Sequence, residues 1–422
     1  MSRLRISGPC RLRGELQVHG AKNSALPLLA ASLLCTSPCV LQNCPHLSDV
    51  DTAVTILREL GCRASFEDGV VAVDPRPASA CAIPDVLMRE MRSSIIFLGA
   101  IIGRAGEASL SFPGGCELGP RPIDLHLQAL RRLGVNIAEN HGRLTCTAPN
   151  GLQGADITLA FPSVGATENI LIAASVARGT TVLENAAREP EIEDLAGFLN
   201  ACGARIVGAG TGTVCIEGVP KLSGCTYRVI PDRIAAATYL AAAAATGSRL
   251  TLLDVVPRHL LPVLPVFEEA GCRILTQGST LSIVPPKMLN RVHSIRTMPY
   301  PGFPTDAQAP IMAMTTVAHG TSIFVENIFE ERYKHVGELL RMGANIRVDG
   351  RVAVVEGVPG LSGAPVEAAD LRGGAALVIA GLVAQGQTVV SGVHHIDRGY
   401  ERIEQALQGL EADVERIPDT ED

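Results

Sequence analysis

Apolar residues recur at helical spacing in six places along this chain. In the three clearest copies they fall at i, i+3, i+4, i+7 and i+10, the pattern of a helix with one buried face. A glycine directly follows each of the first five copies, where a left-handed residue ends a helix, and Glu411 follows the sixth. The copies lie about seventy residues apart, longer than most solenoid units, which favours a closed multi-domain arrangement. The six predicted surface helices cover residues 50–60, 123–133, 192–202, 260–270, 332–342 and 400–410.

A second, almost wholly apolar segment precedes each amphipathic one. The longest of these segments, 95–103, 235–245 and 375–384, are too short to span a bilayer. A helix that is apolar on all sides must be covered on every side. Each repeat therefore reads as strand, buried helix, strand, surface helix, strand. We predict an α/β fold in which sheets surround buried helices, with three repeats in each of two domains. Strands are clearest at residues 180–183, 250–253, 322–325 and 388–390.

Composition narrows the class of protein. The 422 residues are 47% hydrophobic and carry a formal charge of -7, which argues against a nucleic acid or an anionic membrane as partner. Any anionic ligand must therefore meet local cationic side chains. None of the twelve cysteines forms a C-x-x-C pair, so we expect reduced, buried thiols of a cytosolic protein rather than a disulfide framework or a zinc site. The N-terminal segment lacks the apolar core of a signal peptide.

Charged residues mark the predicted starts of the buried helices. Stepping back fourteen residues from the strand after each buried helix reaches Lys22, Arg92, Gly165, Arg233, Asp306 and Arg372. The free N–H groups at a helix start attract anions, so lysine and arginine there favour a phosphate or carboxylate ligand. Asp306 is the exception, because a carboxylate among cations is suited to accept a proton. It could also cap its helix, and the two roles are compatible.

One cysteine lies in a segment that is neither helix nor regular strand. Residues 113–122 are rich in glycine and proline and lengthen the loop of the second repeat. Cys116 in this loop is five residues from Arg121, and nearby positive charge can activate a thiol. The alternative is a cysteine that only fills a turn. An extension confined to one repeat favours function.

Several segments together carry a resemblance to a known family. They are Gly20-Ala21-Lys22-Asn23, Met91-Arg92-Ser93-Ser94, Pro113-Gly114-Gly115-Cys116, Gly119-Pro120-Arg121-Pro122-Ile123-Asp124-Leu125, Ser163-Val164-Gly165-Ala166-Thr167, Phe303-Pro304-Thr305-Asp306 and His395-Ile396-Asp397-Arg398-Gly399-Tyr400-Glu401-Arg402. In this order, over essentially the whole chain, they resemble the UDP-N-acetylglucosamine 1-carboxyvinyltransferases, also called UDP-N-acetylglucosamine enolpyruvyl transferases.

The resemblance implies a fold and a reaction. The fold is an inside-out α/β barrel of two domains, residues 22–230 with the Cys116 loop and residues 1–21 with 231–422, and the active site lies in the cleft between them. The reaction transfers the enolpyruvyl group of phosphoenolpyruvate to the 3'-hydroxyl of UDP-N-acetylglucosamine by addition and elimination, releasing phosphate. It is the first committed step of peptidoglycan precursor synthesis, a cytoplasmic process on which cell-wall biogenesis, cell shape and cell division depend.

The resemblance also implies roles for residues of this chain. Asp306 is the base toward the 3'-hydroxyl. Cys116 gives a proton to C3 of phosphoenolpyruvate, can form a pyruvate adduct, and is the target of the covalent inhibitor fosfomycin. Lys22, with Asn23 beside it, Arg121 and Arg398 hold the donor anion. The implied UDP-sugar contacts are Arg92, Arg121, Pro122, Ile123, Asp124, Leu125, Ser163, Val164, Gly165, Asp306 and Ile328, with Arg332 and Arg372 as further cleft arginines. The chemistry requires no metal and no other cofactor.

Two alternatives stay open at this point. A shikimate-phosphate enolpyruvyl transferase shares the fold and the donor, but that family does not use a cysteine acid in this loop. A non-catalytic paralogue that binds UDP-sugar is the other. His46 and Ser48 stand where some family members carry lysines, so no role is assigned to them.

Overall fold

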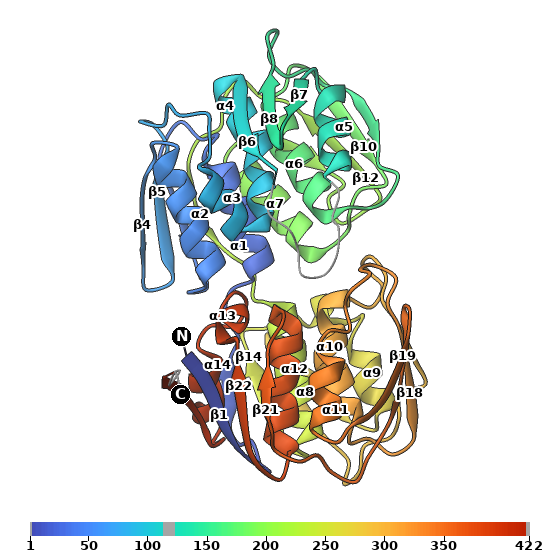
Figure 1. Ribbon diagram of the computed structural model, residues 1–422. Coiled ribbons are helices and arrows are strands. Elements are labelled where there is room, and N and C mark those ends of the chain that lie inside the picture. Colours follow the sequence, from blue (N-terminus) through green and yellow to red (C-terminus); the bar gives the residue numbers. More distant parts are fainter. Residues whose placement is uncertain (1, 113–122, 419–422) are drawn as a thin grey trace. The chain divides into compact units, whose positions relative to one another are not determined.

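Six apolar helices form the interior of this protein. The computed structural model describes residues 2–112 and 123–418, whose contacts divide into two units (Figure 1). We call residues 20–112 with 123–230 the Lys22 unit, and residues 2–19 with 231–418 the Asp306 unit. No helix within the described residues is long and apolar enough to cross a membrane.

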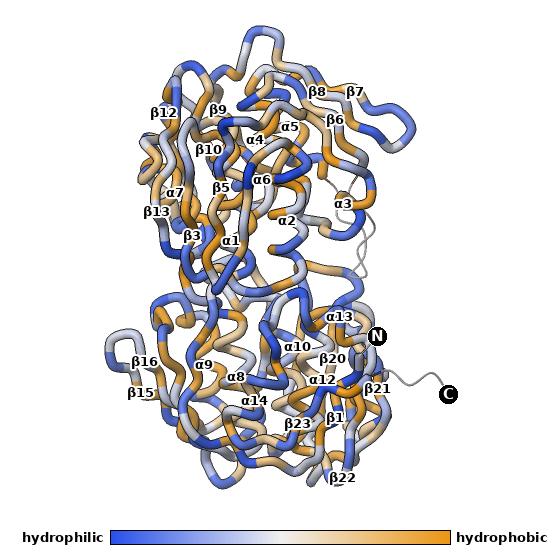
Figure 2. The backbone as a smooth tube through the Cα atoms, turned by 90° about the vertical axis from the view of Figure 1, so that its left-hand side faces the viewer, coloured by the Kyte–Doolittle hydropathy of each residue, from blue (hydrophilic) through white to orange (hydrophobic). Residues whose placement is uncertain are grey.

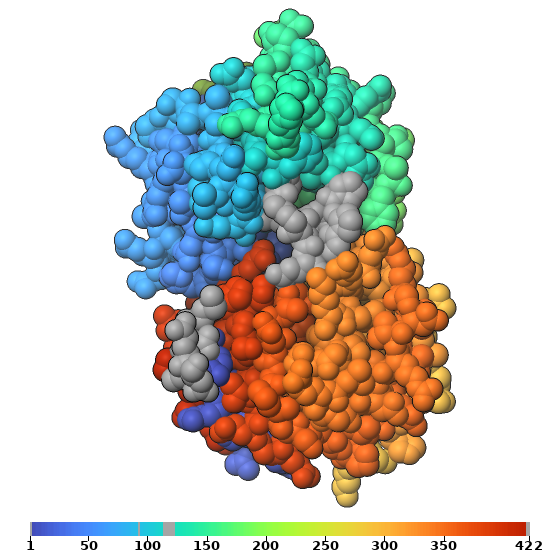
Figure 3. All heavy atoms as spheres, viewed as in Figure 1, coloured from blue at the N-terminus to red at the C-terminus, as the bar shows by residue number. Residues whose placement is uncertain are grey.

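Each unit packs three of these helices against one another. In the Lys22 unit they are α1 (Lys22–Ser32), α4 (Phe97–Ala105), which follows the 3-10 helix η1 (Arg92–Ile96), and α6 (Val164–Ala174). In the Asp306 unit they are α8 (Arg233–Ala245), α10 (Thr305–Thr315) and α12 (Leu371–Val383). Nearly all residues of these helices are buried, because they are apolar on every side. Side chains close the spaces between the elements of each unit on the face drawn in Figure 3.

Three small sheets surround the helices of each unit. The Lys22 unit has β13 (Thr226–Arg228), β3 (Cys39–Gln42), β5 (Val70–Asp74) and β4 (Arg63–Glu67) in one sheet, β11 (Arg205–Val207), β12 (Thr213–Glu217), β10 (Thr180–Glu184) and β9 (Asp156–Thr158) in a second, and β6 (Glu107–Ser111), β8 (Arg143–Thr147) and β7 (Asn136–Asn140) in a third. The Asp306 unit has β21 (Pro365–Glu367), β22 (Gly386–Ser391), β1 (Ser2–Gly8) and β23 (Val414–Pro418), then β15 (Arg273–Gln277), β16 (Thr280–Val284), β14 (Leu250–Leu253) and β2 (Glu15–Gln17), and finally β17 (Ser294–Arg296), β18 (Thr321–Val325), β20 (Val352–Glu356) and β19 (Asn345–Asp349).

The predicted fold class is confirmed, with one difference in the repeat. Strands that pair in parallel flank α6 (β9 and β10), α10 (β17 and β18) and α12 (β21 and β22). The first five surface helices are each followed by an antiparallel hairpin, such as β11 and β12, where the repeat pattern has a single strand, and β23 alone follows the sixth. Residues 208–212 on their own do predict a hairpin. The turn between β11 and β12 spans these residues, where Gly208 and Gly210 have positive φ and allow the chain to reverse. In the three-stranded sheet, an isolated bridge between Ala82 and Ser109 stands in place of the fourth strand.

Several of the amphipathic helices pack directly against the buried helices, and all end as predicted. The amphipathic helices are α2 (Ser48–Glu59), α5 (Asp124–Arg132), α7 (Pro190–Ala201), α9 (Leu264–Glu269), α11 (Val336–Arg341) and α14 (Ile403–Gly409). The five glycines that follow them have φ between 89° and 103°, and Glu411 takes the same region at 65°. In α9 and α11 the helix is shorter than its apolar pattern, since a turn or the 3-10 helix η2 (Pro257–Leu260) takes its first part. The remaining helices are α3 (Asp85–Glu90) and α13 (Val393–Ile396).

Candidate active site

The six positions predicted from the repeat, five charged residues and Gly165, lie at helix starts. Lys22, Arg92 and Arg233 are the first residues of α1, η1 and α8. Gly165, Asp306 and Arg372 are the second residues of α6, α10 and α12. Each therefore lies beside backbone N–H groups that have no partner within the helix.

Lys22 is held in the Lys22 unit by a buried carboxylate. Its Nζ lies 3.2 Å from Oδ2 of Asp49, which is in the first turn of α2. The lysine side chain is 11% exposed and the aspartate 5% exposed. An ammonium group in such a place needs an opposite charge to offset its lost hydration. Asn23, the next residue of α1, is partly exposed. Sequence reasoning assigned Asp49 no role, although an acidic residue in the first turn of a surface helix near a buried lysine is a usable signal.

The predicted UDP-sugar segments of the Lys22 unit begin two helices. Ser163 caps α6, and its Oγ accepts a hydrogen bond of 3.3 Å from the N–H of Ala166. Val164 and Gly165 form the first turn of α6, while Asp124 and Leu125 begin α5 directly after the buried Ile123. Gly165 packs against His126 so closely that an added Cβ would lie 3.0 Å from its ring. The start of α6 therefore lies against α5.

Asn169 ties these segments together. Its buried amide Nδ2 lies 2.8 Å from Nδ1 of His126 in α5 and donates to the carbonyl of Ile95, 2.9 Å away in η1. Its Oδ1 accepts from the N–H of Gly99 at 2.8 Å. One side chain thus fixes α6 relative to α5 and to η1, which begins with Arg92. Sequence reasoning missed this residue because the text around it reads as plain buried helix.

Asp306 is held in the Asp306 unit by two buried arginines. Nη2 of Arg332 donates to Oδ1 at 2.9 Å, and Nη2 of Arg372 donates to Oδ2 at 3.0 Å. Each arginine side chain is 2% exposed, whereas Asp306 is 28% exposed. The guanidinium groups therefore lie behind the carboxylate, which solvent and ligands can reach. Both arginines were predicted as ligand contacts, and the structure places them against Asp306.

Arg372 is further supported by an aromatic ring. Its guanidinium carbon lies 5.2 Å from the ring centre of Tyr400, within the range of a cation–π contact. The Tyr400 hydroxyl lies 2.8 Å from Oγ1 of Thr238 in α8. Although burial alone would lower it, the neighbouring Tyr400 and Asp306 hold the pKa of Arg372 above its ordinary value. Arg372 therefore keeps its charge inside the unit.

Glu326 organises the segment that contains Ile328. Its side chain is buried, and Oε1 accepts hydrogen bonds from the N–H groups of Ile328 and Phe329 at 2.8 and 3.1 Å. Its Oε2 accepts from Oγ1 of Thr305 at 3.0 Å, one residue before Asp306. The turn at Ile328 and the start of α10 are thus linked through one carboxylate, which sequence reasoning also missed.

The remaining predicted residues differ in what can be said of them. Arg398 is half-buried in the turn after α13. Its neighbour Asp397 pairs with Arg416 of β23 at 2.7 Å, which anchors this turn to the sheet. Cys116, Arg121 and Pro122 lie outside the described residues.

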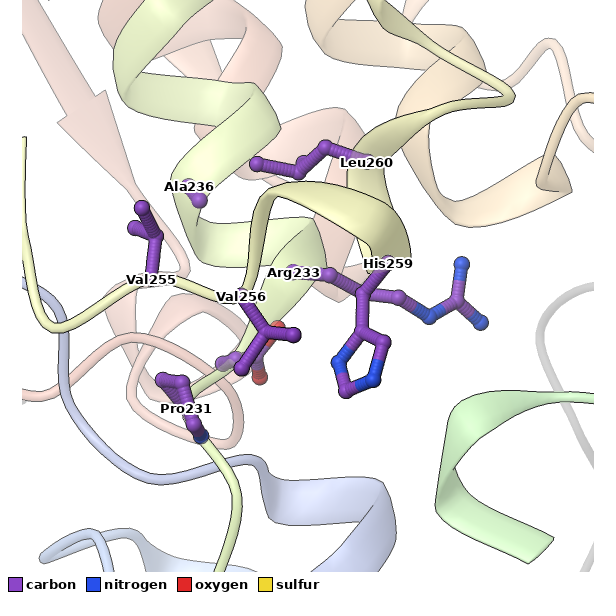
Figure 4. Close-up of a pocket in the computed structure, with 8 residues that line it drawn as sticks. Pro231, Arg233, Ala236, Val255, Val256, His259 and Leu260 are labelled. Atoms are coloured by element: carbon purple, nitrogen blue, oxygen red, sulfur yellow. The ribbon is translucent and has the colours of Figure 1, made fainter. Parts of the chain in front are cut away.

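A small pocket opens at the start of α8, where Arg233 lies. Pro231, Asp232, Arg233, Ala236, Val255, Val256, His259 and Leu260 line it. Asp232 caps α8 by accepting hydrogen bonds from Ile234 and Ala235. The side chains of Arg233 and His259 extend away from the apolar lining (Figure 4). Burial, helped by Arg258 and Arg233, lowers the pKa of His259 to about 4, so its imidazole is neutral at pH 7.

Comparison with known proteins decides the family. The family model described as EPSP synthase (3-phosphoshikimate 1-carboxyvinyltransferase) matches residues 6–407. A UDP-N-acetylglucosamine 1-carboxyvinyltransferase 2 of Caldanaerobacter subterraneus subsp. tengcongensis is 53% identical over 417 residues, with 99% of this chain and 100% of that relative covered. The chain belongs to the UDP-N-acetylglucosamine 1-carboxyvinyltransferase family.

Other relatives place this carboxyvinyltransferase family within a larger fold group. A UDP-N-acetylglucosamine 1-carboxyvinyltransferase 1 of Carboxydothermus hydrogenoformans is 48% identical, and 99% of each chain is covered. The crystal structure of the enolpyruvyl transferase NikO from Streptomyces tendae superposes with a TM-score of 0.89 at 26% identity over 99% of both chains. An EPSP synthase structure from Acinetobacter baumannii has a TM-score of 0.77 at 18% identity, covering 99% of this chain and 100% of its own, and shows the shared fold.

Proposed function

We propose that this chain transfers the enolpyruvyl group of phosphoenolpyruvate to the 3'-hydroxyl of UDP-N-acetylglucosamine and releases phosphate. Identity of 48–53% along whole chains to carboxyvinyltransferases of that name supports the reaction. The observation that carries the residue assignment is the half-buried carboxylate of Asp306, held at a helix start by two buried arginines. As an enzyme of this family it would act in peptidoglycan precursor synthesis, in the cytoplasm.

The reaction needs one base and one acid. In the addition step the 3'-hydroxyl attacks C2 of phosphoenolpyruvate and loses its proton, while C3 gains a proton, giving a tetrahedral ketal. In the elimination step C3 returns a proton, the C2–O bond to phosphate breaks, and the enolpyruvyl ether forms. We assign Asp306 as the base for the hydroxyl and Cys116 as the proton donor to C3.

The arginine pair supports the first assignment. Arg332 and Arg372 take one oxygen each, which fixes the carboxylate in a single orientation. The Asp306 side chain is 28% exposed, which leaves the carboxylate accessible to an acceptor hydroxyl. We therefore assign Arg332 and Arg372 as positioning residues for Asp306.

The donor anion requires cationic partners. We assign Lys22, Arg121 and Arg398 to the phosphate and carboxylate of phosphoenolpyruvate, with Asn23 as a hydrogen-bonding neighbour of Lys22. The N–H groups at the start of α1 favour an anion at the same place. Because Asp49 already pairs with Lys22, the lysine is held in one place before the ligand arrives.

The remaining residues are assigned to the acceptor nucleotide. We propose that it is bound by Arg92, Arg121 to Leu125, Ser163 to Gly165, Asp306 and Ile328. The hydrogen bonds of Asn169 and Glu326 support this assignment, since each fixes a segment that contains several of these residues. Asp306 and Lys22 belong to different units, so the proposed reaction uses side chains of both.

A phosphate-release assay tests the proposal. Phosphoenolpyruvate is supplied with UDP-N-acetylglucosamine, with shikimate 3-phosphate, or without an acceptor. We expect release only with the UDP-sugar, and time-dependent inactivation by fosfomycin with its adduct at Cys116. Release with shikimate 3-phosphate alone would assign the other reaction. UDP-sugar binding without phosphate release would assign a non-catalytic binding protein.

A further inference from the structure

Four cysteines gather in the Lys22 unit, at the far end of α1 from Lys22. The Sγ atoms of Cys35, Cys39 and Cys202 all lie within 4.8 Å of one another, and all three residues are buried. The Sγ atom of Cys225, which is half-buried, lies 3.5 Å from that of Cys202. The eleven residues of α1 put roughly 15 Å between this cluster and Lys22. The cluster is therefore separate from the candidate active site.

Backbone hydrogen bonds connect the segments around the cluster. Cys35 follows α1 and bridges to Leu222, and Cys39 opens β3, which pairs with β13 directly after Cys225 (Figure 2). The N–H of Val40 donates to the carbonyl of Cys225 at 2.9 Å. Cys202 caps the C-terminus of α7. Hydrogen bonds between neighbouring backbone segments thus hold all four cysteines in place.

The connection between Cys202 and Cys225 passes unusually close to the first cysteine pair. The N–H of Ser223 donates to the carbonyl of Cys202 at 2.8 Å, and the N–H of Gly224 donates to Oγ of Ser37 at 2.8 Å. A Cβ on Gly224 would lie 2.0 Å from the carbonyl oxygen of Pro38, so only glycine fits there. This close approach brings cysteines from distant parts of the chain together.

The spacing of the sulfur atoms suits a tetrahedral thiolate site. Zinc binds thiolate sulfur at about 2.3 Å, which places the sulfur atoms of a tetrahedral site about 3.8 Å apart. The Sγ atoms of Cys35, Cys39 and Cys202 lie within 4.8 Å of one another, near that value. The Sγ atom of Cys225 lies 3.5 Å from that of Cys202 and would have to approach the other two. A disulfide instead requires about 2.05 Å and would use only two of the four thiols. Clusters of four thiolates are typical of structural zinc sites.

We propose that Cys35, Cys39, Cys202 and Cys225 bind one zinc ion as a structural site. Binding releases the four thiol protons to solvent and forms four zinc–sulfur bonds. The ion links Cys39, at the start of β3, to Cys225, directly before β13. It therefore connects segments near the beginning and the end of the Lys22 unit. Because the unfolded chain holds no such cluster, zinc stabilises the folded state.

Metal binding to the full chain tests this site without an activity assay. The purified, reduced protein is stripped with a chelator and then titrated with Zn²⁺ alone or with Co²⁺ alone. We expect one equivalent of Zn²⁺ to stay bound through gel filtration and to raise Tm by about 4 °C or more. Co²⁺ should give a thiolate charge-transfer absorption band.

Variants identify the ligands. Cys39→Ala and Cys202→Ala should weaken zinc binding by more than about 100-fold, whereas Cys146→Ala, a buried cysteine outside the cluster, should bind as the wild type does. Cys116→Ala should also retain binding. Wild-type protein that keeps no Zn²⁺ and shows no charge-transfer band would overturn the proposal even if the variants fail to fold. So would equal affinity in Cys202→Ala, or a disulfide within the cluster in protein purified without reductant.

Discussion

Two helix starts at equivalent places in the repeat carry opposite charges. Lys22 begins α1 in one unit and pairs with Asp49 from the surface helix of its own repeat. Asp306 lies in the first turn of α10 in the other unit and pairs with Arg332, just before the surface helix of its repeat, and with Arg372. The same architecture thus positions a cation in one unit and a carboxylate in the other.

The two positions differ in what the helix itself favours. A helix start stabilises negative charge, so Asp306 agrees with its helix and Lys22 opposes it. Lys22 is also almost completely buried, where a lysine is rare unless paired. Stability alone therefore does not account for Lys22. In the proposed reaction an anionic ligand would bind beside Lys22 at the start of α1. Asp306 already has favourable cationic partners and needs no ligand to stabilise its charge, so it can serve as the base.

The largest expected effect concerns the acid, which neither helix start supplies. If Cys116 donates a proton, Cys116→Ser should lower turnover by about three orders of magnitude, because a hydroxyl is too weak an acid. Cys116→Asp should keep substantial turnover, because a carboxylic acid can donate. Steady-state phosphate release compares the two variants. Equal activity, high or low, would indicate that Cys116 has a structural role and that the acid must be sought elsewhere.

A smaller effect is expected at Lys22. Lys22→Gln removes a charge-assisted contact to the donor anion, which should raise KM for phosphoenolpyruvate about 10- to 100-fold and lower kcat much less. Lys221→Gln, at an exposed lysine of the same unit, is the matched control. An unchanged KM for phosphoenolpyruvate in Lys22→Gln would show that Lys22 does not bind the donor anion, and the proposed difference between the two helix starts would be wrong.

The smallest effect tests the repeat itself. Glu411 occupies with φ 65° the position that glycine holds in the other five repeats. Glu411→Gly should raise the free energy of unfolding by about 0.5–1 kcal/mol, because glycine adopts this conformation without strain. Its ion pair with Arg13 is exposed and contributes little. Urea unfolding measures the change. Destabilisation by Glu411→Gly would show that glycine is not favoured at this helix end, unlike at the other five.

The repeat could be predicted from the sequence because most of its elements have a characteristic local sequence pattern. Apolar runs placed α8 and α12, helical periodicity placed α2 and α7, and glycine marked the helix ends. Residues 208–212 were interpreted as a hairpin turn, which the pairing of β11 with β12 confirms. The other hairpins were missed because two short strands with a polar turn, such as β15 and β16, resemble one strand and a loop. Helix length in α9 was overestimated because apolar spacing continues through a 3-10 turn.

Residues of the candidate site could be predicted from the sequence only where they occupy an equivalent position in the repeat or belong to a family motif. Asp306 and Lys22 meet both conditions. Asp49, Asn169 and Glu326 meet neither condition, since their roles come from burial and from hydrogen bonds or ion pairs that include partners distant in sequence. The cysteine cluster was missed for the same reason: no C-x-x-C pair is present, and the sulfur atoms meet only when residues 35–39 pack against residues 202–225.

The central claim is that Asp306 accepts the proton of the acceptor hydroxyl. The most direct measurement compares turnover and UDP-N-acetylglucosamine affinity in Asp306→Asn, with Asp85→Asn, an exposed first-turn residue of α3, as the control. Asparagine keeps the size, and its one carbonyl oxygen can still accept a hydrogen bond from Arg332 or Arg372, but it cannot take a proton. We predict a loss of turnover of about two orders of magnitude or more, with UDP-sugar affinity changed less than about threefold and the control unaffected. Near-normal turnover in Asp306→Asn would contradict the assignment.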